Sequence, residues 1–495
     1  MIKIDDVLAA PATGAYYATD LEALQQTPLP VEEQYRADPV TRGFRHVREV
    51  AQAVSVGLVL GAGQDGGHGP RLPVAWGDCV AVAYAGHAGR DPVFRTSDGV
   101  TAIRRHVAPL LADRQVTSFR EIAAAVDGVR REVRVPLEIE QAEEPESTVE
   151  SQPGDEGGGL SRRELLTAPF RALRAEAESE PPPPRTVLRR RPLHVAVRYG
   201  VSQAALQAVA LARGVTMAEV IAEEWALPVP DGAVPIHAQS GSDRYTNADK
   251  MIVRRVDSLP HALVENVPAQ LGEDGEQLVC YARWLKERIA ELGGPNYRPA
   301  VHLDVHGALG RIYNHNLGRV LGFLHRLESA VRPLTLRVES PVIMETRGEQ
   351  IETMRTLREY VQFRDMGVQI VADEWANTLE DIAAFVDAGA ADMIQIKMPD
   401  LGSVTDTVDA VLVCKEGGVG AFLGGSCAET DVSARVAAHV ALATRPAMVM
   451  ARPGMGVDEG ISIVQNEMSR TLVRIRGRGG KAGATASSRM PRMDE

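Results

Sequence analysis

Residues 369–397 (QIVADEWANTLEDIAAFVDAGAADMIQIK) decide the fold class, because they hold an apolar strand-like run, a helix-length stretch and a second apolar run. Strand–helix–strand units of this kind are typical of parallel sheets. Similar apolar runs recur through the C-terminal half, separated by amphipathic sequence of helical length. They lie at 234–237, 262–264, 301–304, 336–339, 369–373, 393–397, 421–423 and 448–450. Eight strands in roughly 240 residues predict an α/β fold, a (β/α)8 TIM barrel.

The sequence outside the barrel predicts a capping domain and two irregular segments. Short β-type runs at 55–60 and 80–84, followed by helical sequence, predict a small α+β unit. One segment is rich in Pro, Gly and charge, a composition typical of disorder, and the last twenty residues are expected to be a frayed terminus. The expected parts are an N-terminal α+β capping domain at 1–142, a disordered insert at 143–191, the remainder of the cap with the connection at 192–232, the barrel at 233–475 and a flexible tail at 476–495.

The composition narrows the class of protein. The 495 residues are 44% apolar and 24% charged, and 54 Lys plus Arg against 66 Asp plus Glu give a net charge of −12. This acidity argues against a general nucleic-acid binder, whose surface would be basic. The four cysteines show no metal-ligand or disulfide spacing. Asp5 and Asp6 interrupt any signal peptide, and no apolar run is long enough for a membrane span. We therefore expect a cytoplasmic protein with no membrane partner.

Three carboxylates follow consecutive predicted barrel strands: Asp304, Glu339 and Asp373. Their spacing of roughly 35 residues is one strand–helix unit, so all three should meet at the C-terminal mouth of the barrel. Three unpaired anions that close would repel one another unless they share a divalent cation, and all-oxygen ligation favours Mg²⁺. Any single one of these acids could instead cap a helix. His302, Asp304 and His306 also alternate on one face, which leaves zinc as an alternative.

The next strand ends in Lys397, which shares a face with Gln395. A bound dication and partial desolvation can lower the pKa of a lysine, which makes Lys397 a candidate general base. Gln239 and His261 lie at the end of the first predicted strand and the start of the second. They should face Lys397 across the mouth, an arrangement suited to removing a proton next to a carboxylate.

Several motifs make the chain similar to a known family. The carboxylate trio with its lysine resembles the enolase superfamily, in which Mg²⁺ and a Lys or His base act together. More specifically, the chain resembles the 3-methylaspartate ammonia-lyases. The motifs that carry the resemblance are VAWGDC at 74–79, GRDP at 89–92, RYG at 198–200, AQSG at 238–241, DRY at 243–245, LPHA at 259–262, HLDV at 302–305, LRVE at 336–339, VADEW at 371–375, QIK at 395–397, PDLG at 399–402, GGSCAET at 424–430 and PGMGVDEG at 453–460.

The resemblance implies an activity, cofactors and site residues. It implies reversible elimination of ammonia from (2S,3S)-3-methylaspartate to give mesaconate, by a homodimer that uses Mg²⁺ and a monovalent cation such as K⁺. The position of Lys397 would take the C3 proton, and that of His261 would act on the opposite face. The implied metal ligands are Asp304, Glu339 and Asp373, and the implied substrate contacts are Gln239, Gln395, Ser426 and Cys427.

The chain departs from the family pattern at a few positions. Ser426 stands where the family more often has Thr, Met450 where we expect Leu, and Phe422 where Tyr is familiar. The insert at 143–191 is expected to be foreign to the family. Two alternatives remain at this point: another enolase-superfamily enzyme, such as a dehydratase or cycloisomerase, and a non-catalytic relative that uses the insert for binding.

Overall fold

The computed structural model describes residues 2–27, 29–62, 73–82, 84, 87–136, 186–241, 243–426, 428–451 and 454–479. The chain divides into two compact units. The larger comprises Met1–Gly128 and His194–Glu495, and the smaller comprises Val129–Leu193.

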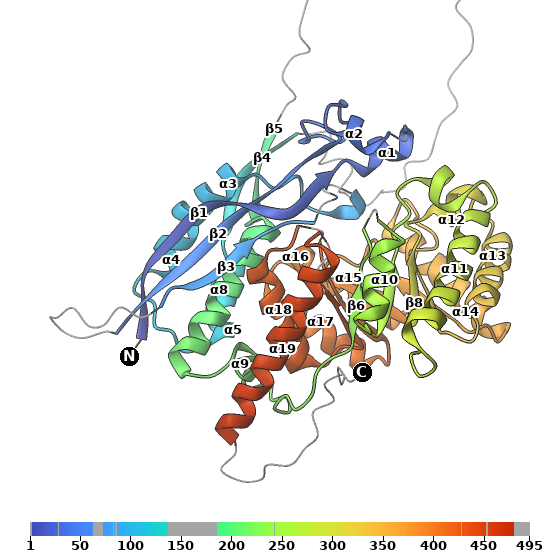
Figure 1. Ribbon diagram of the computed structural model, residues 1–495. Helices are drawn as coiled ribbons and strands as arrows, with labels where there is room; N and C mark the ends of the chain where they lie inside the picture. The colour runs from blue at the N-terminus through green and yellow to red at the C-terminus, as the bar shows by residue number, and fades with distance from the viewer. Residues whose placement is uncertain are drawn as a thin grey trace, which may run out of the picture. The chain divides into compact units, whose positions relative to one another are not determined.

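Eight parallel strands form a closed barrel within the larger unit (Figure 1). Each strand pairs with the next in the chain, and the last pairs with the first through Val449 and Ile236. The predicted (β/α)8 barrel is therefore confirmed. The strands are β6 (Ile236–Ala238), β7 (Ser258–His261), β8 (Ala300–Asp304), β9 (Leu336–Glu339), β10 (Val368–Ala372), β11 (Met393–Lys397), β12 (Gly420–Gly424) and β13 (Met448–Ala451).

The second barrel strand differs from the prediction. The apolar run 262–264 was expected to form it, but β7 ends at His261. Ser258 and His261 are polar, so hydrophobicity did not mark this strand, although both side chains are buried inside the protein. Positive φ angles at His261 and Ala262 turn the chain immediately afterwards.

The alternation of side chains along β11 shows how the barrel positions a site. Ile394 and Ile396 are fully buried on the helix-facing side, whereas Met393, Gln395 and Lys397 point inward. Met393 belongs to a buried apolar cluster with Val371, Phe422, Met448 and Met450. The inward-facing residues of β11 therefore change from apolar inside the barrel to polar at its C-terminal mouth.

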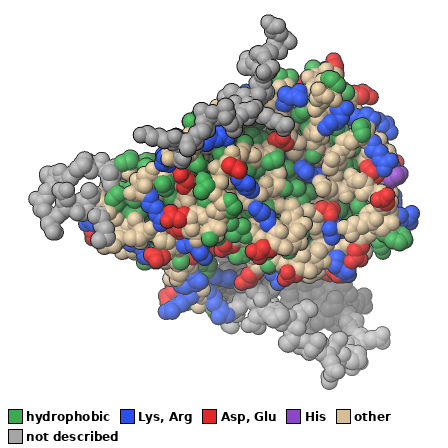
Figure 2. Space-filling model, turned by 90° about the horizontal axis from the view of Figure 1, so that it is seen from below, with side chains coloured by type: hydrophobic (Ala, Val, Ile, Leu, Met, Phe, Trp, Pro, Cys, Tyr) green, Lys and Arg blue, Asp and Glu red, His purple; other side chains and the backbone are tan. Residues whose placement is uncertain are grey.

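Helices surround the barrel strands (Figure 1). Their hydrophobic faces pack inward, and threonine caps fix the start of several of them, as Thr378 and Thr430 do through capping boxes. Figure 2 shows basic and acidic side chains interspersed over one outer face. The helices of this region are α10 (Thr246–Val253), η3 (Val267–Leu271), α11 (Glu276–Gly293), α12 (Ala308–Ile312), α13 (Leu317–Val331), α14 (Arg347–Phe363), α15 (Leu379–Asp387), α16 (Met398–Leu401), α17 (Val404–Glu416), α18 (Asp431–Thr444) and α19 (Val457–Gly479).

The N-terminal part of the larger unit is an antiparallel sheet of three strands, β1 (Ile2–Thr19), β2 (Arg48–Ala62) and β3 (Ala75–Cys79). The strand predicted at 80–84 is wrong, because β3 ends at Cys79 and the chain leaves the sheet there. Helices accompany the sheet, as the α+β prediction requires. They are α1 (Leu21–Gln26), α2 (Val31–Gln34), η1 (His87–Gly89), α3 (Thr96–Ala102), η2 (Ile103–Val107), α4 (Ala108–Leu111), α5 (Phe119–Asp127), α8 (Val195–Arg213) and α9 (Met217–Glu224).

Glycines allow β3 and α8 to approach closely. A Cβ added at Gly200 would lie 2.5 Å from the backbone nitrogen of Cys79, and one at Gly77 would collide with the carbonyl oxygen of Gly200. Replacing Gly200 with alanine is therefore expected to lower the free energy of unfolding by about 1–3 kcal/mol or more. Gly322→Ala is the control, because Gly322 is on the exposed side of α13, where a Cβ meets open space, and the substitution should stabilise the protein slightly. Urea unfolding of the two variants measures the contrast, and equal stabilities would contradict it.

The smaller unit contains a two-stranded antiparallel sheet, in which β4 (Arg130–Pro136) pairs with β5 (Thr186–Pro192). The prediction of disorder is therefore wrong for residues 186–191, where strand pairing overrides the charge of three consecutive arginines. The rest of the predicted insert, 143–185, lies outside the described residues. Helix α19 likewise continues to Gly479, past the expected start of the tail at 476.

Within the described residues, no single helix is long and apolar enough to cross a membrane. Helices α8 and α9 together pass that test on length and composition, but they meet at 94°.

Candidate active site

The C-terminal ends of four neighbouring strands bring the predicted acids and lysine together; Asp304, Asp373 and Lys397 line one cavity, and Glu339 is buried beside it, next to Asp304. Asp304 and Glu339 end β8 and β9 and are paired in register, Asp373 follows β10, and Lys397 ends β11. The cavity has an empty volume of about 320 Å³. It is lined by Tyr84, Gln239, His261, Leu263, Asp304, His306, Asp373, Gln395, Lys397, Gly425 and Met450.

The three carboxylates are almost fully buried, with 3%, 0% and 3% of Asp304, Glu339 and Asp373 exposed. Burial and repulsion from Asp304 and Asp373 hold the pKa of Glu339 well above its usual value. Burial and the neighbouring Glu374 raise the pKa of Asp373 to about 6. In addition, Asp373 Oδ1 has no hydrogen-bond partner among the described residues. Crowded, desolvated oxygen donors of this kind fit a hard dication such as Mg²⁺, which would relieve their repulsion.

Lys397 contacts the carboxylate trio directly. Its Nζ lies 2.5 Å from Asp373 Oδ2, and the residue is 7% exposed. Burial acts to lower its pKa, but the Asp373 carboxylate outweighs burial and the pKa is raised. This direction is opposite to the one expected beside a bound dication, because here the ammonium itself neutralises Asp373. Lys397 and a metal ion therefore compete for the charge of the same carboxylate.

His261 lies at the end of β7, not at the start of the second strand as expected, and is 4% exposed. Its Nε2 is 3.4 Å from Asp304 Oδ2. One ligand atom from each of His261, Asp304 and Glu339 lies within 4.8 Å of the others. The structure thus brings His261 to the carboxylates, on the β7 side of the mouth.

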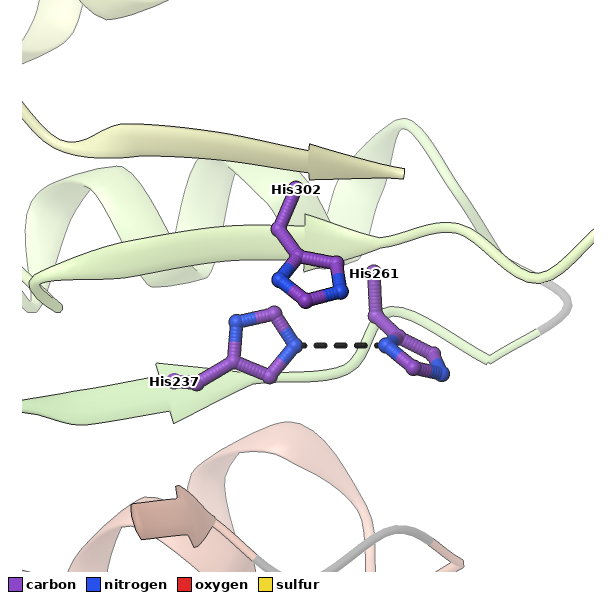
Figure 3. Close-up of side chains that lie close together, drawn as sticks. All are labelled: His237, His261 and His302. Atoms are coloured by element: carbon purple, nitrogen blue, oxygen red, sulfur yellow. Dashed lines mark hydrogen bonds between the residues drawn. The ribbon is translucent and has the colours of Figure 1, made fainter. Parts of the chain in front are cut away.

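Two further histidines lie beside His261, and the sequence analysis missed one of them (Figure 3). His237 Nε2 is 3.3 Å from His261 Nδ1, and His302 Nε2 is 2.7 Å from Glu339 Oε2. Burial holds the pKa of both His237 and His302 well below the usual value. The missed signal was the spacing of His237, which stands two residues before Gln239 on the predicted first strand.

The alternative zinc set of His302, Asp304 and His306 does not converge in the described part of the chain. His302 faces Glu339, whereas His306 Nδ1 lies 3.1 Å from Glu374. The alternation of these residues on one strand is lost because β8 ends at Asp304 and His306 has a φ of 42°.

The predicted substrate contacts are only partly brought together. Gln239 and Gln395 line the cavity, and the Gln395 side-chain amide donates to Glu339 Oε1. Ser426 is buried and its hydroxyl accepts from the Ala428 amide, but it is not among the described residues that line the cavity. Cys427 lies outside the described residues.

A second cavity adjoins the first, because Tyr84, Gln239 and Leu263 line both. Its empty volume is about 880 Å³, and Tyr16 and Tyr17 of β1 contribute to its wall. The N-terminal sheet therefore contributes to the opening of the barrel mouth, which sequence patterns did not indicate.

Arg90, from the loop after η1, fixes a carboxylate cluster that the sequence analysis did not identify. Its Nε donates to Asp400 at 2.7 Å, and its Nη2 lies 4.0 Å from Asp373 Oδ1. All three side chains are nearly inaccessible. The only sequence signal was the position of Arg90 in the GRDP motif.

Removing the Arg90 charge is expected to destabilise the protein. Arg90→Met leaves the Asp400 carboxylate buried without its partner, which costs about 3–5 kcal/mol of unfolding free energy. Arg355→Met on α14 is the matched control, because its partners Glu352 and Glu359 are exposed and its loss should change stability little. Chemical denaturation of both variants measures the difference in unfolding free energy. Equal unfolding free energies would show that Arg90 is not important for stability.

Sequence comparison assigns this arrangement to a family. A profile described as methylaspartate ammonia-lyase C-terminus matches residues 228–477, and one described as methylaspartate ammonia-lyase N-terminus matches residues 2–140 and 162–226. The chain belongs to the methylaspartate ammonia-lyase family. The match confirms the predicted family and the predicted enzyme class, a carbon–nitrogen lyase.

Individual members of the methylaspartate ammonia-lyase family are similar over nearly the whole chain. Methylaspartate ammonia-lyase 2 of Carboxydothermus hydrogenoformans is 41% identical over 97% of this chain and 100% of its own. The magnesium complex of β-methylaspartase from Clostridium tetanomorphum is 38% identical with a TM-score of 0.76, covering 97% of this chain and 100% of that one. The Citrobacter amalonaticus enzyme containing (2S,3S)-3-methylaspartic acid is 38% identical with a TM-score of 0.79, covering 96% of this chain and 100% of that one.

The family match also corrects the expected insert. The N-terminal profile resumes at residue 162, so the prediction that all of 143–191 is foreign to methylaspartate ammonia-lyases is wrong. Between its two matched stretches, only residues 141–161 lie outside the family pattern. The family pattern therefore includes residues 162–191 of the predicted insert.

Proposed function

We propose that this chain catalyses the reversible elimination of ammonia from (2S,3S)-3-methylaspartate to give mesaconate. The observation that carries the proposal is the cavity lined by Asp304, Asp373 and Lys397, with Glu339 paired in register beside Asp304. Family membership supports the substrate, since the Citrobacter amalonaticus relative was solved with (2S,3S)-3-methylaspartic acid. The magnesium complex of the Clostridium tetanomorphum relative supports Mg²⁺ as the ion that the three carboxylates hold.

The chemistry requires a hydrogen next to an ionised carboxylate to leave as a proton. Mg²⁺ held by Asp304, Glu339 and Asp373 would supply Lewis-acid stabilisation of the negative charge that develops on that carboxylate. With the charge of Asp373 taken up by the metal and not by the ammonium, Lys397 can be neutral, and its Nζ accepts the proton from C3. The C3–H electron pair forms the C2–C3 double bond, and the C2–N bond breaks so that the amino group leaves as ammonia. His261, whose Nε2 lies 3.4 Å from Asp304 Oδ2, acts on the face of the substrate opposite to Lys397.

The remaining residues bind and orient the substrate. Gln239 and Gln395 present amides to the cavity, where they would hold the second carboxylate and the ammonium group. Ser426 and Cys427, which follow β12 in the sequence, are proposed to complete these contacts. A monovalent cation such as K⁺ as activator, a homodimer and a cytoplasmic location complete the proposal; they rest on the family resemblance and the sequence.

A steady-state assay tests the function. Purified protein with Mg²⁺ should convert (2S,3S)-3-methylaspartate to mesaconate, which is followed by its ultraviolet absorbance, and EDTA should stop the reaction reversibly. Turnover of aspartate and of 3-ethylaspartate shows which substituents at C3 the site accepts. Turnover of a sugar acid without turnover of methylaspartate would favour a dehydratase of the same superfamily.

A further inference from the structure

Three buried histidines converge beside the carboxylates, from three consecutive barrel strands (Figure 3). His237 lies on β6, His261 ends β7 and His302 lies on β8, with 0%, 4% and 0% of each residue exposed. One ring nitrogen from each lies within 4.8 Å of the others. Imidazole ligands favour zinc, copper, iron and nickel over Mg²⁺, which prefers oxygen. This histidine cluster therefore has a different metal preference from the neighbouring carboxylates.

The spacing of two donor atoms matches that of ligands on a tetrahedral ion. Around an ion with bonds near 2.0–2.1 Å, ligand atoms stand roughly 3.3 Å apart. His237 Nε2 and His261 Nδ1 are 3.3 Å apart. A ring nitrogen of His302 completes the group, in which one nitrogen from each residue lies within 4.8 Å of the others.

The surroundings of His237 also suit a ligand. Its second nitrogen, Nδ1, lies 3.0 Å from Ser258 Oγ, so the hydroxyl can accept the Nδ1 hydrogen. Such a partner on the second nitrogen fixes the tautomer that leaves Nε2 free to coordinate a metal. Phe422 packs edge-on against the His237 ring, with the centroids 5.0 Å apart, and holds it in place.

We propose that His237, His261 and His302 form a second metal site that binds a transition-metal dication such as Zn²⁺. The site shares His261 with the proposed catalytic centre, so its effect on activity rests on the proposed function. Occupation by Zn²⁺ holds His261 away from the substrate. Zn²⁺ is therefore an inhibitor of the Mg²⁺-loaded enzyme.

Zinc binding is measured first without substrate, so that the result does not depend on catalysis. With saturating Mg²⁺ present, titration calorimetry should show one tight Zn²⁺ per chain. His237→Phe, which fills the same space beside Phe422 but cannot coordinate, should weaken this affinity at least about tenfold. His325→Phe on exposed α13 is the matched control and should bind Zn²⁺ as the unmodified protein does. Equal affinity in the His237→Phe and His325→Phe proteins overturns the proposal.

A second variant and a spectroscopic measurement test the metal site even if His237→Phe does not fold. Ser258→Ala removes only the hydroxyl partner and should weaken Zn²⁺ binding about 10–100-fold. X-ray absorption of the zinc-loaded protein should show imidazole scattering, and a purely oxygen shell overturns the proposal. In the mesaconate assay, Zn²⁺ should inhibit the unmodified enzyme at a concentration at least about tenfold lower than it inhibits His237→Phe. If no substrate is turned over, the proposed function fails while the binding experiments still decide the metal site.

Discussion

Lys397→Ala is expected to reduce kcat for elimination from (2S,3S)-3-methylaspartate by about 10²–10⁴-fold, the usual contribution of a positioned general base. The reason is geometric, because the Lys397 amine is buried in the cavity, 2.5 Å from Asp373. The same substitution should leave Mg²⁺ affinity unchanged or increase it. The ammonium no longer competes with the metal for Asp373 Oδ2. Mesaconate formation and titration calorimetry measure the two effects.

Lys250→Ala is the matched control, because Lys250 is an exposed residue of α10 whose partner Asp458 is also exposed. It should keep both kcat and Mg²⁺ affinity. Full elimination activity in Lys397→Ala would show that another group removes the C3 proton. A fall in both kcat and Mg²⁺ affinity would instead mean that Lys397 supports the carboxylates structurally.

The barrel was predictable because its strands leave a strong local signal. The expected run 393–397 coincides with β11, since alternating apolar residues are buried on one side and packed into the barrel on the other. Strand β7 was placed wrongly because only one of its four residues, Leu259, is an apolar residue typical of strands. Ser258 and His261 are polar and gain burial only from their neighbours in the closed barrel. Local hydrophobicity cannot report burial that depends on strands far away in the chain.

In the candidate site, too, some residues were predictable from local sequence and others depend on the tertiary fold. Asp304, Glu339 and Lys397 were predictable because each ends a strand, and strand ends of a barrel share one mouth. Arg90 was not, because it comes from the N-terminal region and reaches Asp373 only through the tertiary fold. His237 was missed because its significance depends on pairing in register with Ser258 and on contact with His261.

Glu339→Gln is expected to abolish Mg²⁺-dependent elimination, because it removes the central anion of the carboxylate set while keeping the shape of the side chain. Loss of a supporting partner alone typically lowers metal affinity 10–100-fold, so loss of a charged ligand should lower Mg²⁺ affinity by more than about 100-fold. The metal-free variant should nevertheless be more stable than the metal-free parent. Burial and repulsion from Asp304 and Asp373 raise the pKa of Glu339, so ionising this carboxyl group costs folding free energy that the neutral Gln side chain does not cost.

Calorimetric melting with and without Mg²⁺ separates these effects. The parent protein should gain Tm when Mg²⁺ is added, whereas Glu339→Gln should start from a higher Tm and gain nothing. Glu359→Gln, on the exposed face of α14, is the control and should behave as the parent does in both conditions. A lower metal-free Tm in Glu339→Gln would mean that hydrogen bonds from Gln395 and His302 stabilise the Glu339 carboxylate more than burial and repulsion destabilise it. In that case the acids would form a stable structural network without a metal, and the repulsion argument for Mg²⁺ would fail.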